Sequence, residues 1–108
     1  HRVMDKESLI QALVKHCAIA GKKLRDQQSV THQLMAFAAS SPFDEQPKSF
    51  KCLMRFEVPT NDTTVLATAV RGKIDELFQQ GVPYYRVGIG LVELRSAHNI
   101  QQALGQAD

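Results

Sequence analysis

The sequence lacks the long apolar run that a membrane-spanning helix requires. Such a helix needs about 20 consecutive apolar residues, and no stretch of these 108 residues approaches that length. No signal-peptide pattern is visible at the start. The contents of 44% hydrophobic and 22% charged residues are typical of an ordinary globular domain. We therefore expect one cytoplasmic domain without a membrane partner.

Metal-binding motifs are also missing. The chain has two cysteines, Cys17 and Cys52, and neither shows the spacing of metal ligands. Both lie in apolar contexts, which predicts buried and reduced thiols. The four histidines are scattered along the sequence. We therefore predict neither a metal site nor a bound cofactor.

Catalytic constellations are absent in the same way. No pair of carboxylates stands out for acid–base chemistry, and no Ser-His-Asp arrangement follows from the spacing. Gly88 and Gly90 lie inside a predicted strand, without the third glycine and the following helix of a phosphate-binding loop. We predict no catalytic residue, and no enzyme activity for this chain alone.

Two amphipathic helices are predicted from the apolar periodicity. The first has Asp5 as its candidate N-cap and ends near Leu24. The second is expected to begin within residues 60–62 and to end just before Gly81, because glycine suits the position after a C-cap. The first apolar stripe comprises Leu9, Leu13, Cys17, Ala20 and Leu24, and the second comprises Leu66, Ala69, Val70, Ile74, Leu77 and Phe78.

Four segments have features of β-strands. Residues 1–4 fit only the end of a strand, and residues 29–40 are apolar enough to fit either a buried strand or a helix. A loop with two prolines, residues 41–47, precedes a clearly alternating strand at residues 49–58. Residues 81–91 also alternate, because side chains in a strand point to opposite faces in turn. One predicted face carries Tyr85, Val87, Ile89 and Leu91, and the other carries Tyr84, Arg86, Gly88 and Gly90.

This order of elements predicts an α+β fold, strand-helix-strand-strand-helix-strand. It forms a four-stranded, mainly antiparallel sheet with two helices on one face. Residues 1–94 are expected to form the domain, and residues 95–108 a polar tail. The second face of the sheet is then left open, and it needs either a partner or a polar surface.

The open face is the candidate binding site. The net charge of +2 and the pI near 8.7 permit a nucleic-acid partner without requiring one. Spaced cations attract phosphates, and glycines let phosphates approach main-chain N–H groups. The ordinary alternatives are a solvated sheet face with some lysine and arginine, and glycines that serve a bulge or close packing. The candidate contacts with DNA are Arg2, Lys51, Arg55, Tyr84, Arg86 and Gly88.

Several short motifs, in a fixed order over about residues 1–94, carry a family resemblance. They are Arg2-Val3, Gly21-Lys22-Lys23-Leu24-Arg25, Ser41-Pro42-Phe43, Pro59-Thr60 with Asp62-Thr63, and finally Gly81, Tyr84, Arg86, Gly88 and Leu91. In these motifs the chain resembles the C-terminal little-finger domain of Y-family translesion DNA polymerases. It is most similar to the UmuC-type subunit of bacterial polymerase V.

The resemblance implies the same four-stranded sheet backed by two helices. It also implies that the sheet lies along the major-groove side of primer–template DNA and contacts mostly phosphates. Arg2 and Arg86 are then the best phosphate contacts, and Arg55 matches a basic position of the family. Lys51 rests on strand alternation alone. In the family, metal ions and nucleotidyl transfer belong to the palm domain, which has no counterpart in this sequence.

Further partners are implied by the same resemblance. They are the palm and fingers domains of the parent chain, an accessory dimer, a recombinase filament and a sliding clamp, in an SOS-type response to DNA damage. Gln101 and Leu104 match a clamp-binding peptide, but Gly105 replaces its aromatic residue, which favours a plain disordered or helical tail. The alternative function is a small protein–protein or ligand-sensing module that self-associates through its open sheet face.

Overall fold

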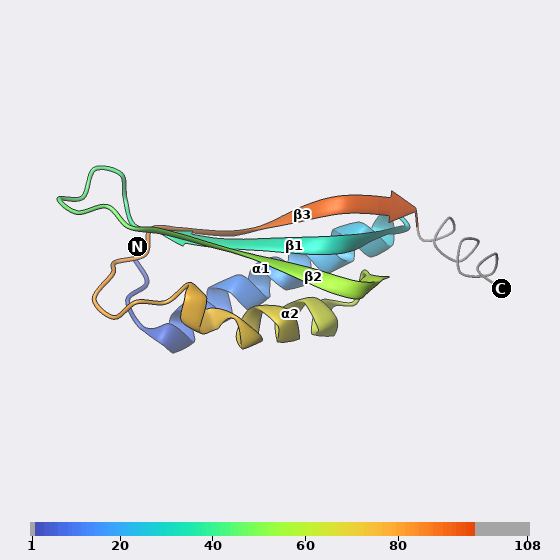
Figure 1. The fold of residues 1–108 in the computed structure, drawn as a ribbon, viewed down its shortest axis with the longest axis horizontal. Coiled ribbons are helices and arrows are strands. Elements are labelled where there is room, and N and C mark those ends of the chain that lie inside the picture. Colours follow the sequence, from blue (N-terminus) through green and yellow to red (C-terminus); the bar gives the residue numbers. More distant parts are fainter. Residues whose placement is uncertain (1, 97–108) are drawn as a thin grey trace.

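The computed structural model describes residues 2–96, apart from the side chain of Glu93. A twisted antiparallel sheet forms one layer, and two helices form the second layer against one of its faces (Figure 1). In chain order the elements are α1 (Lys6–Asp26), β1 (Ser29–Ala39), β2 (Ser49–Thr60), α2 (Thr63–Gly72), a 3-10 helix η1 (Ile74–Glu76) and β3 (Arg86–Ser96). No helix among the described residues is long and apolar enough to cross a bilayer.

Both helices begin where a carboxylate caps them. The backbone N–H of Ser8 donates to Asp5 Oδ2 at 2.9 Å, and that of Thr64 donates to Asp62 Oδ1 at 2.8 Å. The bond from Ser8 lowers the pKa of Asp5, since it stabilises the ionised carboxylate. The predicted apolar stripe of α1 is confirmed, with Leu9, Leu13, Cys17 and Leu24 buried.

The predicted end of the second helix is wrong. Helix α2 stops at Gly72, and the chain continues through η1 instead of running helically to Gly81. Gly81 lies in a turn with φ of +90°, a conformation that glycine adopts without steric penalty. The apolar periodicity continued past Gly72 because Ile74 and Leu77 are also buried in the core.

The sheet confirms the predicted α+β class. The strand order is β2-β1-β3, and both pairs are antiparallel. The expected first strand is present as a single antiparallel bridge, in which Val3 exchanges backbone hydrogen bonds of 2.9 and 2.8 Å with Tyr84. Residues 29–40, which fitted a strand or a helix, contain the central strand. β3 continues to Ser96, and residues 97–108 lie outside the described part of the chain.

The covered face of the sheet holds the core. Over the regular part of the sheet, residues 33–39 of β1, even-numbered side chains of β1 and β2 and odd-numbered side chains of β3 point toward the helices, and a register shift between Thr31 and Gln33 ends this pattern. The core includes Leu34, Ala36 and Ala38 of β1 and Cys52 and Met54 of β2, with Val87, Ile89 and Leu91 of β3 packed against it. The prediction of two buried thiols is confirmed, and both are free.

The two adjacent tyrosines are placed opposite to the prediction. Tyr84 is 1% exposed and packs between Phe50 and Phe78, with ring centroids 6.1 Å from each. Its hydroxyl donates to the Leu77 carbonyl at 2.7 Å and accepts from the Gln79 N–H at 2.8 Å. Tyr85 is 55% exposed. The regular alternation begins only at Arg86, where β3 begins, so the period-2 pattern was extended two residues too far.

Candidate nucleic-acid interface

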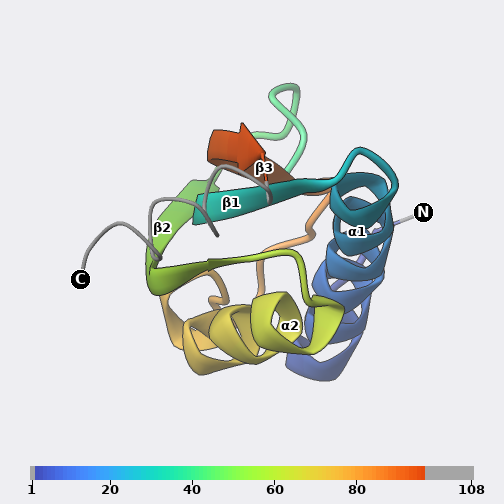
Figure 2. The ribbon, with the colours of Figure 1, turned by 90° about the vertical axis from the view of Figure 1, so that its right-hand side faces the viewer.

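The face of the sheet opposite the helices is uncovered along the described strands (Figure 2). The register places its side chains in four rows across β2, β1 and β3. From the loop end, the rows are Ser49–Ala39–Arg86, Lys51–Phe37–Gly88, Leu53–Met35–Gly90 and Arg55–Gln33–Val92. We call these four rows the open face.

Three predicted cations lie on the open face. Lys51 and Arg55 are exposed on β2, and Arg86 is exposed at the start of β3. None of the three forms an ion pair with a carboxylate whose side chain the structure describes, a set that leaves out Glu93. The four rows therefore carry positive charge on both outer strands and none on the central strand, while Glu57 follows Arg55 on β2 just beyond the last row.

Gly88 lies beneath an aromatic ring. A Cβ atom built at Gly88 would lie 2.5 Å from Cζ of Phe37, its partner on β1. Glycine at this position therefore lets the Phe37 ring cross over β3. The close-packing explanation accounts for Gly88, which is buried, whereas its predicted approach to phosphate stays a prediction without geometric support.

Two further predicted contacts are placed unfavourably for DNA. Tyr84 is buried on the helix side and has both of its hydroxyl hydrogen bonds within the protein. Arg2 donates to both carboxylate oxygens of Asp44 at 2.9 and 2.8 Å, and its guanidinium lies 5.5 Å from the centroid of the Tyr85 ring. The prediction that Tyr84 lies on the open face is wrong, and Arg2 is engaged by a carboxylate.

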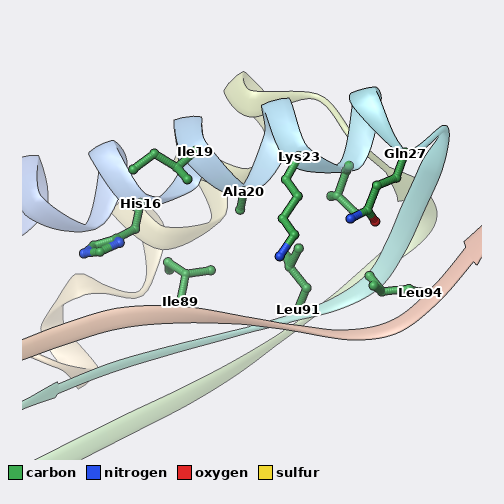
Figure 3. Close-up of a pocket in the computed structure, with 9 residues that line it drawn as sticks. His16, Ile19, Ala20, Lys23, Gln27, Ile89, Leu91 and Leu94 are labelled. Carbon is green, nitrogen blue, oxygen red and sulfur yellow. The ribbon is translucent and has the colours of Figure 1, made fainter.

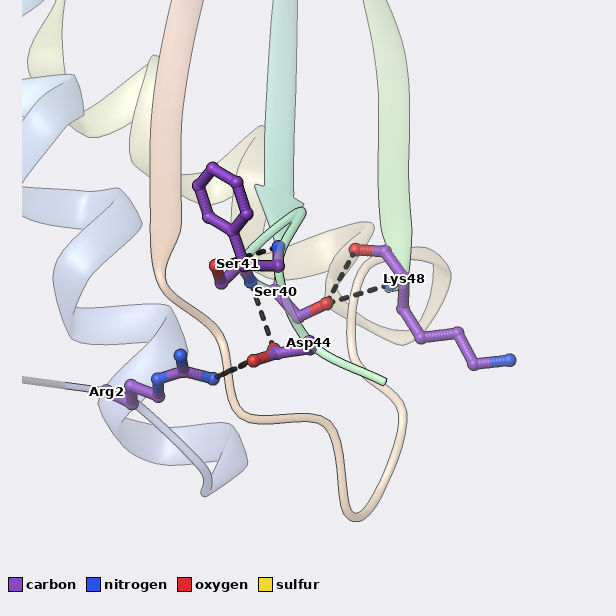
Figure 4. Close-up of polar contacts among 6 residues, drawn as sticks. Arg2, Ser40, Ser41, Asp44 and Lys48 are labelled. Atoms are coloured by element: carbon purple, nitrogen blue, oxygen red, sulfur yellow. Dashed lines mark hydrogen bonds and ion pairs between the residues drawn. The ribbon is translucent and has the colours of Figure 1, made fainter. Parts of the chain in front are cut away.

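The pairing of Arg2 belongs to a network that shapes the β1–β2 loop (Figure 4). Asp44 also accepts from the Ser41 N–H at 3.1 Å, and the base of the loop is closed by Ser40, whose hydroxyl accepts from the Lys48 N–H at 2.8 Å.

Sequence reasoning did not identify Lys48. It is exposed and, with Arg86 and small residues of β1 and β2, lines a hollow of about 240 Å³ beside the open face. The signal in the sequence that could have identified Lys48 is its position directly before the alternating strand at residues 49–58.

A second hollow, of about 440 Å³, lies between α1 and β3 on the helix side (Figure 3). Its only ionisable side chains are His16 and Lys23, and the rest of the lining is apolar apart from Gln27. No carboxylate is among the residues that line it. The lining also includes Ile19, Ala20, Leu24, Ile89, Leu91 and Leu94.

The ionisable groups that burial perturbs are structural. Burial raises the pKa of the Cys17 thiol to about 11, and it also raises the pKa of Cys52, helped by the nearby Glu76 carboxylate. Both thiols therefore stay protonated and unreactive near neutral pH. Within residues 2–96, no three His, Cys, Asp or Glu side chains are grouped to hold a metal ion. The predicted clamp-binding residues, Gln101 and Leu104, lie outside the described residues.

Comparison with known proteins agrees with the resemblance. A family model described as the impB/mucB/samB family C-terminal domain matches residues 1–104. The protein ImpB of Salmonella typhimurium is 26% identical to the chain over 105 residues, which cover 95% of the chain and 25% of ImpB. The chain thus spans about a quarter of the length of this curated relative.

Proposed function

Because this chain belongs to the impB/mucB/samB family C-terminal domains, we propose that it is the DNA-gripping domain of an error-prone, SOS-type translesion polymerase. It is the little finger of a UmuC-like protein, and it holds the sugar-phosphate backbone of primer–template DNA without reading sequence. It does not copy DNA alone, because nucleotidyl transfer in such a polymerase belongs to a palm domain elsewhere in the parent protein.

One observation carries this proposal. The open face has unpaired cations on both of its outer strands, namely Lys51 and Arg55 on β2 and Arg86 on β3. These four rows contain no carboxylate, and the first one on β2, Glu57, lies just beyond the Arg55 row. Such a surface releases counterions from a polyanion and binds it in a salt-dependent way. Lys48 extends the same charge toward the β1–β2 loop.

The partners follow from this assignment. The domain works beside the palm and fingers of the parent chain, in the cytoplasm, and its substrate is damaged template DNA paired with a primer. An accessory dimer, a recombinase filament and a sliding clamp act with the parent polymerase. None of the described residues is assigned to these proteins.

The test is fluorescence anisotropy with a labelled primer–template duplex over a range of salt concentrations. We expect affinity to fall steeply with salt, and Arg86→Ala to lower the slope of log K against log salt by about one. Arg71→Ala is the matched control, because Arg71 is exposed on α2, away from the open face, and changes the net charge equally. Salt-independent binding, or equal effects of the two substitutions, would contradict the proposal.

The alternative function is self-association through the open face. It is supported by Leu53, which is 58% exposed in the middle of that face. Sedimentation velocity at several protein concentrations, with and without DNA, separates the two functions. A concentration-dependent dimer that DNA does not dissociate favours the alternative, and a monomer that binds DNA favours the polymerase domain.

A further inference from the structure

Phe43, in the β1–β2 loop, is the most exposed of the large hydrophobic side chains that the structure describes. It is 95% exposed, whereas the other exposed side chains of this kind lie between 41% and 66%. Leaving an aromatic ring in water is unfavourable, and aromatic residues are enriched where a partner covers them. The phosphate contacts proposed for the open face do not use this ring.

Hydrogen bonds within the loop hold the backbone on both sides of the ring. The Phe43 N–H donates to Ser41 Oγ at 3.1 Å, and the Asp44 N–H donates to the Ser41 carbonyl at 3.1 Å. The Asp44 side chain is itself held by Arg2 and by the Ser41 N–H (Figure 4). The loop therefore presents the ring on an ordered backbone, which lowers the entropy cost of binding.

The residue next to Phe43, Pro42, lines the hollow of about 240 Å³ at the loop end of the open face. The two cations of this hollow, Lys48 and Arg86, are both exposed. Neither is paired with a carboxylate whose side chain the structure describes. An exposed aromatic ring thus lies in the same loop that walls a cationic hollow.

The loop also carries two carboxylates. Asp44 is neutralised by its ion pair with Arg2, and Glu45 is exposed. Against Glu45 stand Lys48 and Arg86, so this end of the domain keeps a net positive charge. Charged residues are depleted at the centre of protein–protein interfaces. The setting therefore favours a polyanion over a protein as the partner of the ring.

An aromatic side chain beside unpaired cations is the combination that binds single-stranded nucleic acid, because the base stacks on the ring and the cations hold the backbone. In a duplex the faces of the bases are already stacked on one another, so a side chain finds a free face only on an unpaired base. We propose that Phe43 stacks on an unpaired base of the template strand, and that Lys48 and Arg86 hold the adjoining phosphate. The inference rests on the proposed function and adds single-stranded DNA to its ligands.

The test measures anisotropy with three probes that share one duplex. The first has a blunt end, the second a single-stranded template extension of thymidines, and the third the same extension built from abasic nucleotides. The abasic extension keeps the phosphates and lacks the bases, so it separates stacking from charge. We expect the thymidine extension to bind about five- to tenfold more tightly than the abasic one, and Phe43→Ala to abolish this difference. Lys48→Ala should weaken binding to both extensions alike and lower the salt slope.

Tryptophan gives a direct readout at the same position, because the chain contains none. In Phe43→Trp, the thymidine extension should quench the fluorescence and the abasic extension should not. Val65→Trp is the matched control, because Val65 is 41% exposed on α2 in the helix layer (Figure 1). Its fluorescence should respond to neither extension. Circular dichroism verifies that each variant is folded, and truncation of the exposed Phe43 removes no core packing.

Three results would overturn the inference. Equal affinity for the thymidine and abasic extensions, with the salt dependence intact, shows that no base stacks and leaves the proposed function standing. A preference for bases that persists in Phe43→Ala assigns the stacking to another residue. A dimer that forms without DNA and that Phe43→Ala abolishes assigns the ring to a protein contact. Loss of all salt-dependent binding, in contrast, overturns the proposed function and the inference with it.

Discussion

The two faces of one sheet differ in what they bury and in what they leave exposed. Toward the helices, Leu34 is fully buried in a continuous apolar core. On the opposite face, Leu53 is 58% exposed, although it belongs to the neighbouring strand and is of the same residue type. The difference follows from the pleat, because successive side chains of each strand point alternately to the covered face and to the open face.

The comparison also separates two kinds of apolar residue. The covered face is closed by packing and needs no partner. The open face keeps the exposed Leu53 between the cations Lys51 and Arg55 of the same strand, and exposed apolar surface of this kind is more often a binding surface than a packing one. Stability and binding should therefore respond to different substitutions in the same strands.

The largest expected effect is the contrast between Leu34→Ala and Leu53→Ala. Truncation of Leu34 should lower the free energy of unfolding by about 2–5 kcal/mol, because a cavity replaces a fully buried side chain. Truncation of Leu53 should change it by less than about 0.5 kcal/mol. Urea unfolding followed by circular dichroism measures both, and similar losses would contradict the assignment of the faces.

A smaller contrast concerns the adjacent tyrosines. Tyr84→Phe removes the acceptor of the Gln79 N–H and the donor to the Leu77 carbonyl, which should cost about 1–3 kcal/mol of stability. Tyr85→Phe should be nearly neutral, since Tyr85 is exposed. The same urea experiment tests both variants. An unchanged DNA affinity in folded Tyr84→Phe would confirm that Tyr84 is not a contact residue.

The pH dependence gives the Tyr84 contrast a second readout. Burial raises the pKa of Tyr84 above its ordinary value of 10, so the folded state holds the phenol proton more tightly than the unfolded state does. This contribution to stability is complete below pH 10 and is lost as the pH rises through the folded pKa. Tyr84→Phe should flatten the decline above pH 10.

The smallest contrast is between the two glycines of β3. Gly88→Ala should destabilise the domain by about 1 kcal/mol, because the new Cβ meets the Phe37 ring. Gly90→Ala should be neutral or stabilising by about 0.5 kcal/mol, since a Cβ there makes ordinary contact with Met35. Thermal unfolding measures both. If Phe37→Leu fails to restore the stability of Gly88→Ala, the ring is not the cause.

Much of the fold could be predicted from local patterns. The stripe of α1, the capping residue Asp5 and the alternation of residues 49–58 depend on neighbours within a few positions, and the structure agrees with all three. The end of α2 was mispredicted, because buried residues in η1 continue an apolar pattern after the helix has stopped.

The candidate site was predictable only in part. Lys51, Arg55 and Arg86 lie on the open face as alternation predicted, because that rule holds inside a regular strand. The direction of Tyr84 and the pairing of Arg2 with Asp44 could not be predicted, for one reason. Each residue lies at the start of a strand or before it, where distant partners decide the direction of the side chain.

By itself, the sequence determined the two helices, the main strands, the shortage of catalytic chemistry and the residues that resemble a polymerase little finger. These features depend on residue type and on spacing of two to four positions. Tertiary structure alone decided that Phe37 covers Gly88, that Asp44 holds Arg2 and that Tyr84 is buried. Each of these contacts joins side chains whose meeting depends on strand register and loop closure, which no local pattern encodes.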